Sequence, residues 1–203
     1  MSRIKDIKKC TDNRFLNFYE LSAERRNGNI YPYYMSSRAK DSKDLKINTK
    51  INTPDGVIIY ALYGEQKDRV VLVRQFRYPI DDYIYEFPAG LVEPGEDMKE
   101  AAIREMYEET GLTLSPLSVP DGYTKPCFTT IGMTDESCGT IFGYASGSPT
   151  NCHQETSEDI QIILADRTEC RRILKEEPIA IKCAYMLMHF IHDTEDPFSF
   201  LQL

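Results

Sequence analysis

Residues 90–112, which read GLVEPGEDMKEAAIREMYEETGL, decide the fold of this chain. Pro94 and Gly95 predict a turn, and a helix is expected from about Asp97 to Thr110, where Gly111 stops it. Because successive residues are rotated by about 100° around a helix, one face should form an apolar stripe that packs on a core. The stripe consists of Met98, Ala102, Ile103, Met106 and Tyr107.

Three glutamates, Glu105, Glu108 and Glu109, share another face of this helix because they are three and four residues apart. Like charges at this spacing repel by about 0.2–0.5 kcal/mol per pair on an exposed helix. Two interpretations follow: the face is simply solvated, or it binds a cation. Three carboxylates with some water suit a hard octahedral ion such as Mg²⁺ or Mn²⁺.

The spacing of the residues around the three glutamates distinguishes between these interpretations. Five residues separate Gly90 from Glu96, and seven more precede Arg104. The complete set of defined positions is Gly90, Glu96, Arg104, Glu105, Glu108, Glu109, Gly111 and Leu112. This pattern resembles the signature of the Nudix hydrolases at every defined position, which favours the cation-binding interpretation.

The resemblance implies an α/β Nudix fold, in which a mixed β-sheet is sandwiched between helices. It also implies hydrolysis of the phosphoanhydride of a nucleoside diphosphate derivative with Mg²⁺, or alternatively Mn²⁺, as cofactor. The implied metal ligands on and before the helix are Glu105, Glu109, Glu108 and the carbonyl group of Ala89. Arg104 and Glu96 would orient the carboxylates, and Arg104 can pair with Glu108 four residues later.

Apolar runs on both sides of the signature predict the rest of the sheet and its helices. Strands are expected at 57–63, 70–76, 83–87, 139–145 and 160–165, and helices at 168–177 and 179–192. Pro178 separates the last two helices and suits the first turn of the second. The order of elements favours a mixed sheet covered by helices.

The first fifty residues predict a small β-sheet appendage. Runs 15–21 and 30–35 flank the Asn27-Gly28 turn and form a hairpin, with Pro32 at an edge or bulge. Residues 45–52 alternate and predict a further strand.

A turn at residues 53–56 marks the expected domain boundary, between an appendage at 1–53 and a Nudix domain at 54–203. The appendage is too small to be stable alone, so we expect it to pack on the main domain or on a second subunit.

Two segments near the signature resemble the ADP-ribose and ADP-sugar pyrophosphatase branch of the family: VVLVRQFRYP at 70–79 and YEFPAG at 85–90. The resemblance nominates Arg77 as a substrate contact, the alternative being an ordinary surface residue of a strand. It also implies a homodimer in which the appendage supplies Tyr33 and Arg38 to the adenine and the terminal ribose. The alternative for Tyr33 is a place in the dimer core.

A second acidic cluster, Glu155 to Asp159, precedes the strand predicted at 160–165. In the resembled branch a loop here supplies one metal ligand and one general base. Glu158 matches the ligand, whereas Thr156 stands where the base is expected and cannot act as one. Either Glu155 or Glu158 is therefore the candidate base, and an ordinary polar loop is the remaining alternative.

One departure from the branch concerns substrate. Ile131 stands where the branch usually has proline, which leaves room for GDP-mannose, NADH, or a flavin or coenzyme A derivative. A catalytically silent domain that senses a nucleotide is a third alternative. The three intact glutamates argue against it.

Composition limits the partners. The chain has 203 residues, of which 41% are hydrophobic, so it can bury a core. Its 24 basic and 32 acidic residues give a net charge of −8, which excludes a general nucleic-acid binder and means that a phosphate substrate must be attracted through metal ions. Six scattered cysteines, the lack of a long apolar run and the lack of a signal peptide predict a cytoplasmic protein without membrane contact.

Overall fold

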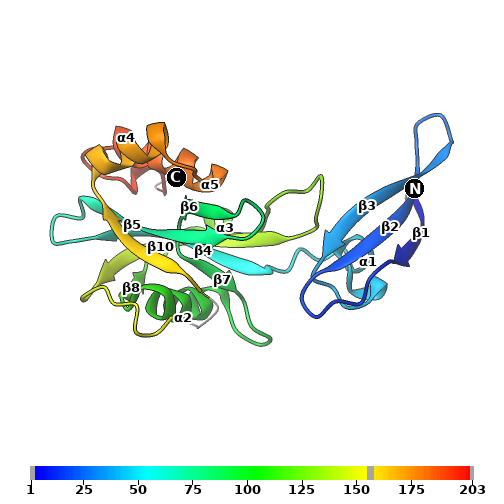
Figure 1. Ribbon diagram of the computed structural model, residues 1–203, viewed down its shortest axis with the longest axis horizontal. Coiled ribbons are helices and arrows are strands. Elements are labelled where there is room, and N and C mark those ends of the chain that lie inside the picture. Colours follow the sequence, from blue (N-terminus) through cyan, green and yellow to red (C-terminus); the bar gives the residue numbers. More distant parts are fainter. Residues whose placement is uncertain (1–2, 155–157, 202–203) are drawn as a thin grey trace. The chain divides into compact units, whose positions relative to one another are not determined.

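The computed structural model describes residues 3–154 and 158–201 and divides the chain into two compact units (Figure 1). The first unit combines Met1–Asp55 with Pro126–Cys138, and the second combines Gly56–Lys125 with Gly139–Leu203. The predicted boundary after residue 53 lies close to the end of the first segment. The predicted division used two continuous domains, whereas the structure groups the 126–138 segment with the first 55 residues, and its partners there are about 90 residues or more away in sequence.

The first unit contains a three-stranded antiparallel sheet in the order β1-β2-β3. Its strands are β1 (Ile4–Lys9), β2 (Asn17–Glu24) and β3 (Ile30–Ser37), and the predicted hairpin is the β2–β3 pair. Pro32 lies on an edge strand, as expected for a residue without a backbone N–H. One face of the sheet is buried through Tyr19, Leu21 and Met35, which pack with Leu45.

Residues 45–52 do not form the predicted strand. They contain the short helix α1 (Lys46–Thr49), which follows a 3-10 turn, η1 (Ser42–Asp44), and ends at Lys50 with a positive φ of 60°. The alternating pattern was misleading because Leu45 alone is fully buried, and the N–H of Lys46 is held by the Asp135 carboxylate. Strand β1 went unpredicted because its charged sequence, IKDIKK, leaves most side chains exposed or half-buried.

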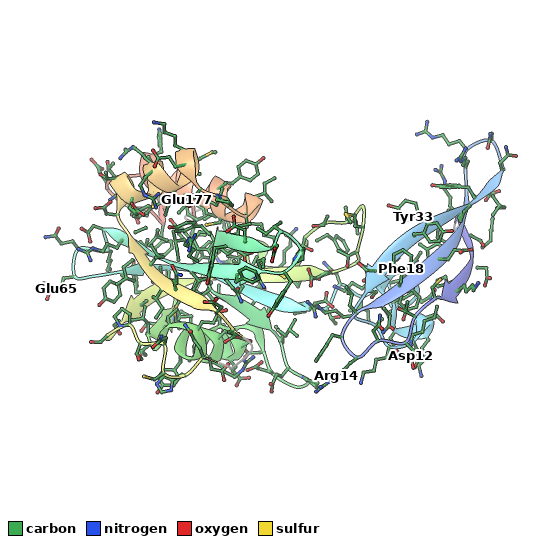
Figure 2. The ribbon with its side chains drawn as sticks, viewed as in Figure 1. Asp12, Arg14, Phe18, Tyr33, Glu65 and Glu177 are labelled. Carbon is green, nitrogen blue, oxygen red and sulfur yellow. The ribbon has the colours of Figure 1, made fainter. Side chains whose placement is uncertain are left out.

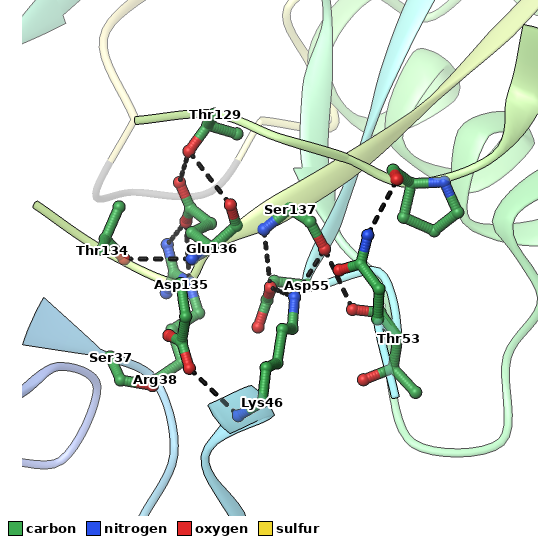
Figure 3. A network of polar contacts seen from close by, with 12 residues as sticks. Ser37, Arg38, Lys46, Thr53, Asp55, Thr129, Thr134, Asp135, Glu136 and Ser137 are labelled. Atoms are coloured by element: carbon green, nitrogen blue, oxygen red, sulfur yellow. Dashed lines mark hydrogen bonds and ion pairs between the residues drawn. The ribbon is translucent and has the colours of Figure 1, made fainter. Parts of the chain in front are cut away.

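A polar network joins the two segments of the first unit (Figure 3). The Lys46 ammonium binds the Asp55 carboxylate and the Ser137 hydroxyl, and the Ser137 N–H donates to the same carboxylate at 2.8 Å. The Lys46 and Asp55 side chains are 12% and 22% exposed, so this pair is partly removed from solvent. The network fixes the end of the first segment to the start of β10 (Ser137–Ser146).

Replacing Lys46 with methionine is expected to destabilise the first unit. The change keeps the apolar stem but leaves the Asp55 carboxylate with only neutral donors, at a cost of about 1–3 kcal/mol. Thermal unfolding followed by circular dichroism should therefore show a Tm lower by about 2–4 °C for each kcal/mol lost. Lys43→Met, at an exposed position on η1, is the control and should leave the Tm unchanged.

The second sheet runs in the order β11-β5-β4-β10-β8, with β6 paired to β5, β7 to β4 and β9 to β10. Its remaining strands are β4 (Gly56–Tyr63), β5 (Arg69–Arg77), β6 (Asp82–Glu86), β7 (Ala89–Leu91), β8 (Thr113–Pro116), β9 (Cys127–Phe128) and β11 (Ile160–Ala165). Its helices are α2 (Met98–Thr110), α3 (Asp121–Thr124), α4 (Arg167–Glu176) and α5 (Ile181–His192), with a 3-10 turn, η2 (Ser199–Leu201), near the end. The predicted strands and helices of the Nudix domain are thus present.

Alternation along β4 produces two cores, one on each face of the sheet. Val57, Ile59 and Ala61 pack with α2, whereas Tyr60 and Leu62 pack with residues of α4 and α5. Figure 1 shows α2 on one side of the sheet and α4 with α5 on the other. The predicted α/β class, a mixed sheet between helices, is confirmed.

Helix α5 begins later than the sequence predicted. Pro178 is not in its first turn, because the Tyr85 N–H donates to the Pro178 carbonyl at 2.9 Å and the following residue bridges to β6. This pairing keeps residues 178–180 extended, and the helix starts at Ile181. Among the described residues, no helix is long and apolar enough to cross a membrane.

Candidate active site

Helix α2 begins and ends where its local sequence dictates. The Asp97 side chain accepts the N–H groups of Lys99 and Glu100, while the Glu100 side chain accepts the Asp97 N–H, which completes a capping box. Gly111 ends the helix with φ of 70°, a left-handed conformation that glycine adopts readily. These two ends fix which residues of α2 face the sheet.

The buried face of α2 differs from the predicted stripe. Ile103 and Tyr107 are 43% and 47% exposed, so the prediction is wrong at these positions. The buried residues are Ala101, Ala102, Met106, Glu109 and Thr110. Small alanine side chains let the helix lie close to the sheet, and this turns Glu109 inward, whereas the larger Ile103 and Tyr107 point outward.

Glu109 is a buried acid with few partners. It is 3% exposed, and its Oε2 accepts the N–H of Ala89 at 3.1 Å. Burial raises the pKa of Glu109 well above its ordinary value, and the nearby Glu105 carboxylate raises it further. The site therefore holds a carboxylate that needs a proton or a cation.

Glu105 lies against Gly90, where a larger residue would displace its carboxyl group. A Cβ atom added to Gly90 would stand 1.9 Å from the Glu105 carboxyl group. The Glu105 side chain is 12% exposed, and burial raises its pKa while the Arg104 guanidinium lowers it. Strand β7 and helix α2 thus approach closely enough to enclose two carboxylates.

Arg104 orients the acidic groups around it. Its Nε and Nη2 bind the two oxygens of Glu96, both at 2.9 Å. Its Nη1 donates to Glu105 at 2.8 Å and to Glu108 at 3.0 Å, so the ion pair expected between Arg104 and Glu108 is present. A further bond to the Leu91 carbonyl ties the guanidinium to the end of β7. One fixed cation thus sets the positions of three carboxylates.

The donor set fits a hard divalent cation. Glu105 and Glu158 both raise the pKa of Glu109, and Glu158 also raises the pKa of Glu105, so the three carboxylates lie within electrostatic reach of one another. Oxygen donors of this kind suit Mg²⁺ and Mn²⁺. Within residues 3–154 and 158–201, no three His, Cys, Asp or Glu side chains are already arranged as a metal site. The ligand roles of Glu105, Glu108, Glu109, Glu158 and the Ala89 carbonyl therefore stay predictions.

The loop before β11 brings Glu158 toward the helix. The next residue, Asp159, accepts the Phe76 N–H through its carbonyl at 3.1 Å and the Tyr83 hydroxyl through its carboxylate. These bonds anchor Asp159 to β5 and β6, and the adjacent Glu158 lies within electrostatic reach of Glu109, whose pKa it raises. The candidate base Glu155, together with Thr156, lies outside the described residues.

Glu158→Gln compared with Glu155→Gln is expected to separate a metal ligand from a general base. Loss of a ligand should raise the Mg²⁺ concentration needed for half-maximal rate, whereas loss of a base should lower the rate at saturating Mg²⁺. We expect Glu158→Gln to show the first behaviour because its carboxylate raises the pKa of both Glu105 and Glu109. Steady-state kinetics over a Mg²⁺ titration measure both effects. Wild-type behaviour of both variants would remove the loop from the reaction.

The three predicted substrate residues fall in different units. Arg77 lies at the end of β5 in the second unit, pairs with Glu86 at 2.6 Å, and lowers the pKa of Glu109. Tyr33 and Arg38 belong to the first unit. The Tyr33 ring packs on the buried face of the small sheet and its hydroxyl donates to the Gly132 carbonyl at 2.6 Å, while Arg38 pairs with Glu136 at 3.0 Å. Their contacts with substrate stay predictions.

Sequence reasoning missed two residues beside the helix. The side-chain amide of Gln154 donates to the backbone carbonyls of Glu109 and Ile160, at 2.7 and 3.3 Å, and so links the end of α2 to β11. His153 stacks on the exposed Tyr107 ring at 4.4 Å. In the sequence, only their position directly before the acidic cluster indicated that they lie near the site.

Parts of this chain are similar in sequence to known proteins. The chain is 35% identical over 120 residues to the putative nudix hydrolase 2 of Caenorhabditis elegans, which covers 56% of this chain and 52% of that protein. It is 39% identical over 79 residues to the ADP-ribose pyrophosphatase of Bacillus subtilis (strain 168), covering 38% and 42%. The chain therefore spans about half the length of these curated relatives.

A solved structure described as "Crystal structure of ADP compounds hydrolase" superposes with a TM-score of 0.61 and covers 85% of this chain and 82% of the other. At 17% identity this similarity shows the fold alone. The NUDIX domain model matches residues 52–166, which is more than half of the chain and includes α2 together with β7 and Glu158. By sequence and by fold, the chain belongs to the NUDIX domain family.

Proposed function

We propose that this chain is a divalent-metal-dependent pyrophosphatase that hydrolyses the diphosphate bond of ADP-ribose or a related ADP-sugar, giving AMP and a sugar phosphate. The observation that carries the proposal is the inward position of Glu105 and Glu109 on α2, against Gly90. Glu105 raises the pKa of the buried Glu109, and this pair has little structural value because ionised groups in a poorly solvated site repel.

Each acidic residue has a separate task in this proposal. Glu105, Glu109 and Glu158 would hold the metal ions. Arg104 keeps the Glu105 carboxylate in position by donating to it. When bound, Mg²⁺ or Mn²⁺ neutralises the diphosphate and lowers the pKa of the attacking water. Glu108, whose side chain is 43% exposed, is accessible to an incoming ligand. The base that takes the proton of the water is Glu155 or Glu158.

The ADP-sugar preference is supported by Arg77 and by relatives. Arg77 lies on the second unit within electrostatic reach of Glu109, and its guanidinium can bind phosphate oxygens in a bidentate manner. The ADP-ribose pyrophosphatase of Bacillus subtilis matches this chain over 79 residues. Tyr33 and Arg38 would contact the adenine and the terminal ribose.

A second candidate is the same reaction on GDP-mannose, NADH, or a flavin or coenzyme A derivative. It is favoured by Ile131, which is 63% exposed where the ADP-sugar branch usually has proline. A release assay for AMP, GMP and phosphate over these substrates, with Mg²⁺ and with EDTA, distinguishes the candidates. ADP-ribose should be hydrolysed fastest. Preference for GDP-mannose would promote the second candidate, and hydrolysis of none would indicate a nucleotide sensor.

A homodimer and a cytoplasmic location are part of the proposal. Phe18 and Tyr34 stack at 5.7 Å on the outer face of the β2–β3 hairpin and are 44% and 49% exposed (Figure 2 labels Phe18). Ile30 lies on the same face and is 53% exposed. Such an apolar patch is typically covered by another surface, and a second copy of the chain supplies one. Light scattering measures the mass in solution.

A further inference from the structure

Cys127 and Cys138 lie directly opposite each other in the antiparallel ladder between β9 and β10. The Thr129 N–H donates to the Glu136 carbonyl at 3.0 Å, so 129 and 136 form a hydrogen-bonded pair. Pair types alternate along an antiparallel ladder, and 127 with 138 is therefore again a hydrogen-bonded pair, in which Cα atoms stand about 5.5 Å apart. Disulfides span Cα distances of about 4.4–6.8 Å.

The two thiols also share one face of the ladder. Side chains of opposed residues point the same way, and neighbouring pairs point to opposite faces. The next pair, Phe128 and Ser137, faces Lys46: its ammonium lies 5.9 Å from the Phe128 ring and binds the Ser137 hydroxyl. Cys127 and Cys138 therefore point together to the other face.

Their exposure differs in a way that suits oxidation. Cys127 is exposed and Cys138 is half-buried, and both are thiols in this structure. Cys170 and Cys183 are buried instead, where burial raises the pKa of Cys170 to about 12 and raises that of Cys183 as well. Because the thiolate is the nucleophile, the buried thiols are inert. Within the pair on the β9–β10 ladder, the exposed Cys127 is the thiol that a peroxide reaches more readily.

We propose that Cys127 and Cys138 form a dithiol modification site that a hydroperoxide oxidises to a reversible disulfide. This inference does not rest on the proposed hydrolysis. The Cys127 thiolate attacks one peroxide oxygen, the O–O bond breaks, and hydroxide or alkoxide leaves to give a sulfenic acid. The Cys138 thiol then attacks the Cys127 sulfur, losing its proton as the S–S bond forms and water departs. Two thiols lose two electrons, and one hydroperoxide gains them.

The disulfide would close a ring around the segment that holds β3. Gly132 accepts the Tyr33 hydroxyl, Met133 accepts the Ser36 N–H, and Glu136 pairs with Arg38. Closing a loop of this length restricts the unfolded chain. We therefore expect oxidation to raise the Tm of the wild-type protein by roughly 5–10 °C.

Mass spectrometry after brief treatment of the full chain with hydrogen peroxide tests the site. Loss of two hydrogens, about 2 Da, is expected in the wild type and should be reversed by dithiothreitol. Cleavage after Glu136 separates the two cysteines, so the resulting peptides should stay joined only while the disulfide is present. Cys127→Ser and Cys138→Ser should lose the link, whereas the exposed-cysteine controls Cys10→Ser and Cys152→Ser should keep it.

Three results would overturn the proposal. The first is a link that maps to any other pair of cysteines. The second is addition of two oxygens to Cys127 without a link, which would show that Cys138 does not reach the sulfenic acid. The third is a 127–138 link without a rise in Tm, which would show that the folded ladder is strained by the bond and does not accommodate it. Circular dichroism confirms that the serine variants keep the fold.

Discussion

Glu109→Gln is expected to lower kcat about a thousandfold while the protein keeps its fold. The amide has nearly the shape of the carboxyl group but cannot supply the negative charge that a metal ion needs at this buried position. Its oxygen can still accept the Ala89 N–H, which protects the link between β7 and α2. Steady-state kinetics with ADP-ribose measure the loss. A folded variant with more than about a tenth of the wild-type rate would contradict the metal role of α2.

The same change should stabilise the protein when metal is absent. Burial and Glu105 raise the pKa of Glu109, so the folded state binds a proton more tightly than the unfolded chain does. This contribution is complete below the ordinary carboxyl pKa and is lost as pH rises through the raised pKa. At neutral pH in EDTA, Glu109→Gln should melt above the wild type, and the difference should shrink as pH falls.

Thermal unfolding at several pH values checks this second effect, with Glu108→Gln as the half-exposed control on the same helix. A lower Tm for Glu109→Gln than for the control at neutral pH would show that Glu109 is a structural residue. A higher Tm together with a lower kcat would show that the Glu109 charge destabilises the fold but is needed to bind the metal ion.

Gly90→Ala is expected to lower kcat about a hundredfold with little change in Tm. The new Cβ would meet the Glu105 carboxyl group at 1.9 Å, and the flexible end of Glu105 can move away where a backbone atom could not. A displacement of about 1 Å in a catalytic group commonly costs this much rate. The rate should also need more Mg²⁺, because Glu105 is displaced rather than removed.

A matched alanine substitution at another glycine separates crowding of the Glu105 carboxyl group from a general effect of replacing glycine by alanine. Gly122 belongs to the second unit, and an added Cβ there meets no heavy atom within 4 Å. Gly122→Ala should therefore keep the wild-type rate and Tm. Equal rates for Gly90→Ala and Gly122→Ala would mean that Glu105 does not work from the position seen against β7.

The sequence predicted the parts of the fold that local chemistry determines. Asp97 with Glu100 and Gly111 define α2 without help from the rest of the chain, and alternation along β4 specifies two buried faces. The sequence was misleading where contacts between residues far apart in the chain determine the local structure. Residues 45–52 form a helix because Leu45 and the Asp135 carboxylate hold them, and nothing within the segment reveals a partner about 90 residues away.

The candidate site shows the same limit. Glu105, Glu108, Glu109 and Arg104 were predicted as site residues from their spacing and from its resemblance to a family signature, and the structure shows Arg104 paired with Glu105 and Glu108. Helical periodicity could not show that Tyr107 points outward, because apolar side chains fit either a core or a stacking contact such as that with His153. Gln154 was missed because a single amide has no characteristic spacing.

The discontinuous first unit has a consequence for biosynthesis. Asp55 and Ser137, which bind each other, are 82 residues apart, so at about 5–20 residues per second the ribosome needs roughly 4–16 s to deliver the second after the first. Helix α2 is translated within that interval. During that time the Ser36 N–H lacks the Met133 carbonyl and the Lys46 ammonium lacks the Ser137 hydroxyl. The three-stranded sheet of the first unit is thus translated before α2, but its contacts with the 126–138 segment form only after α2 has been made.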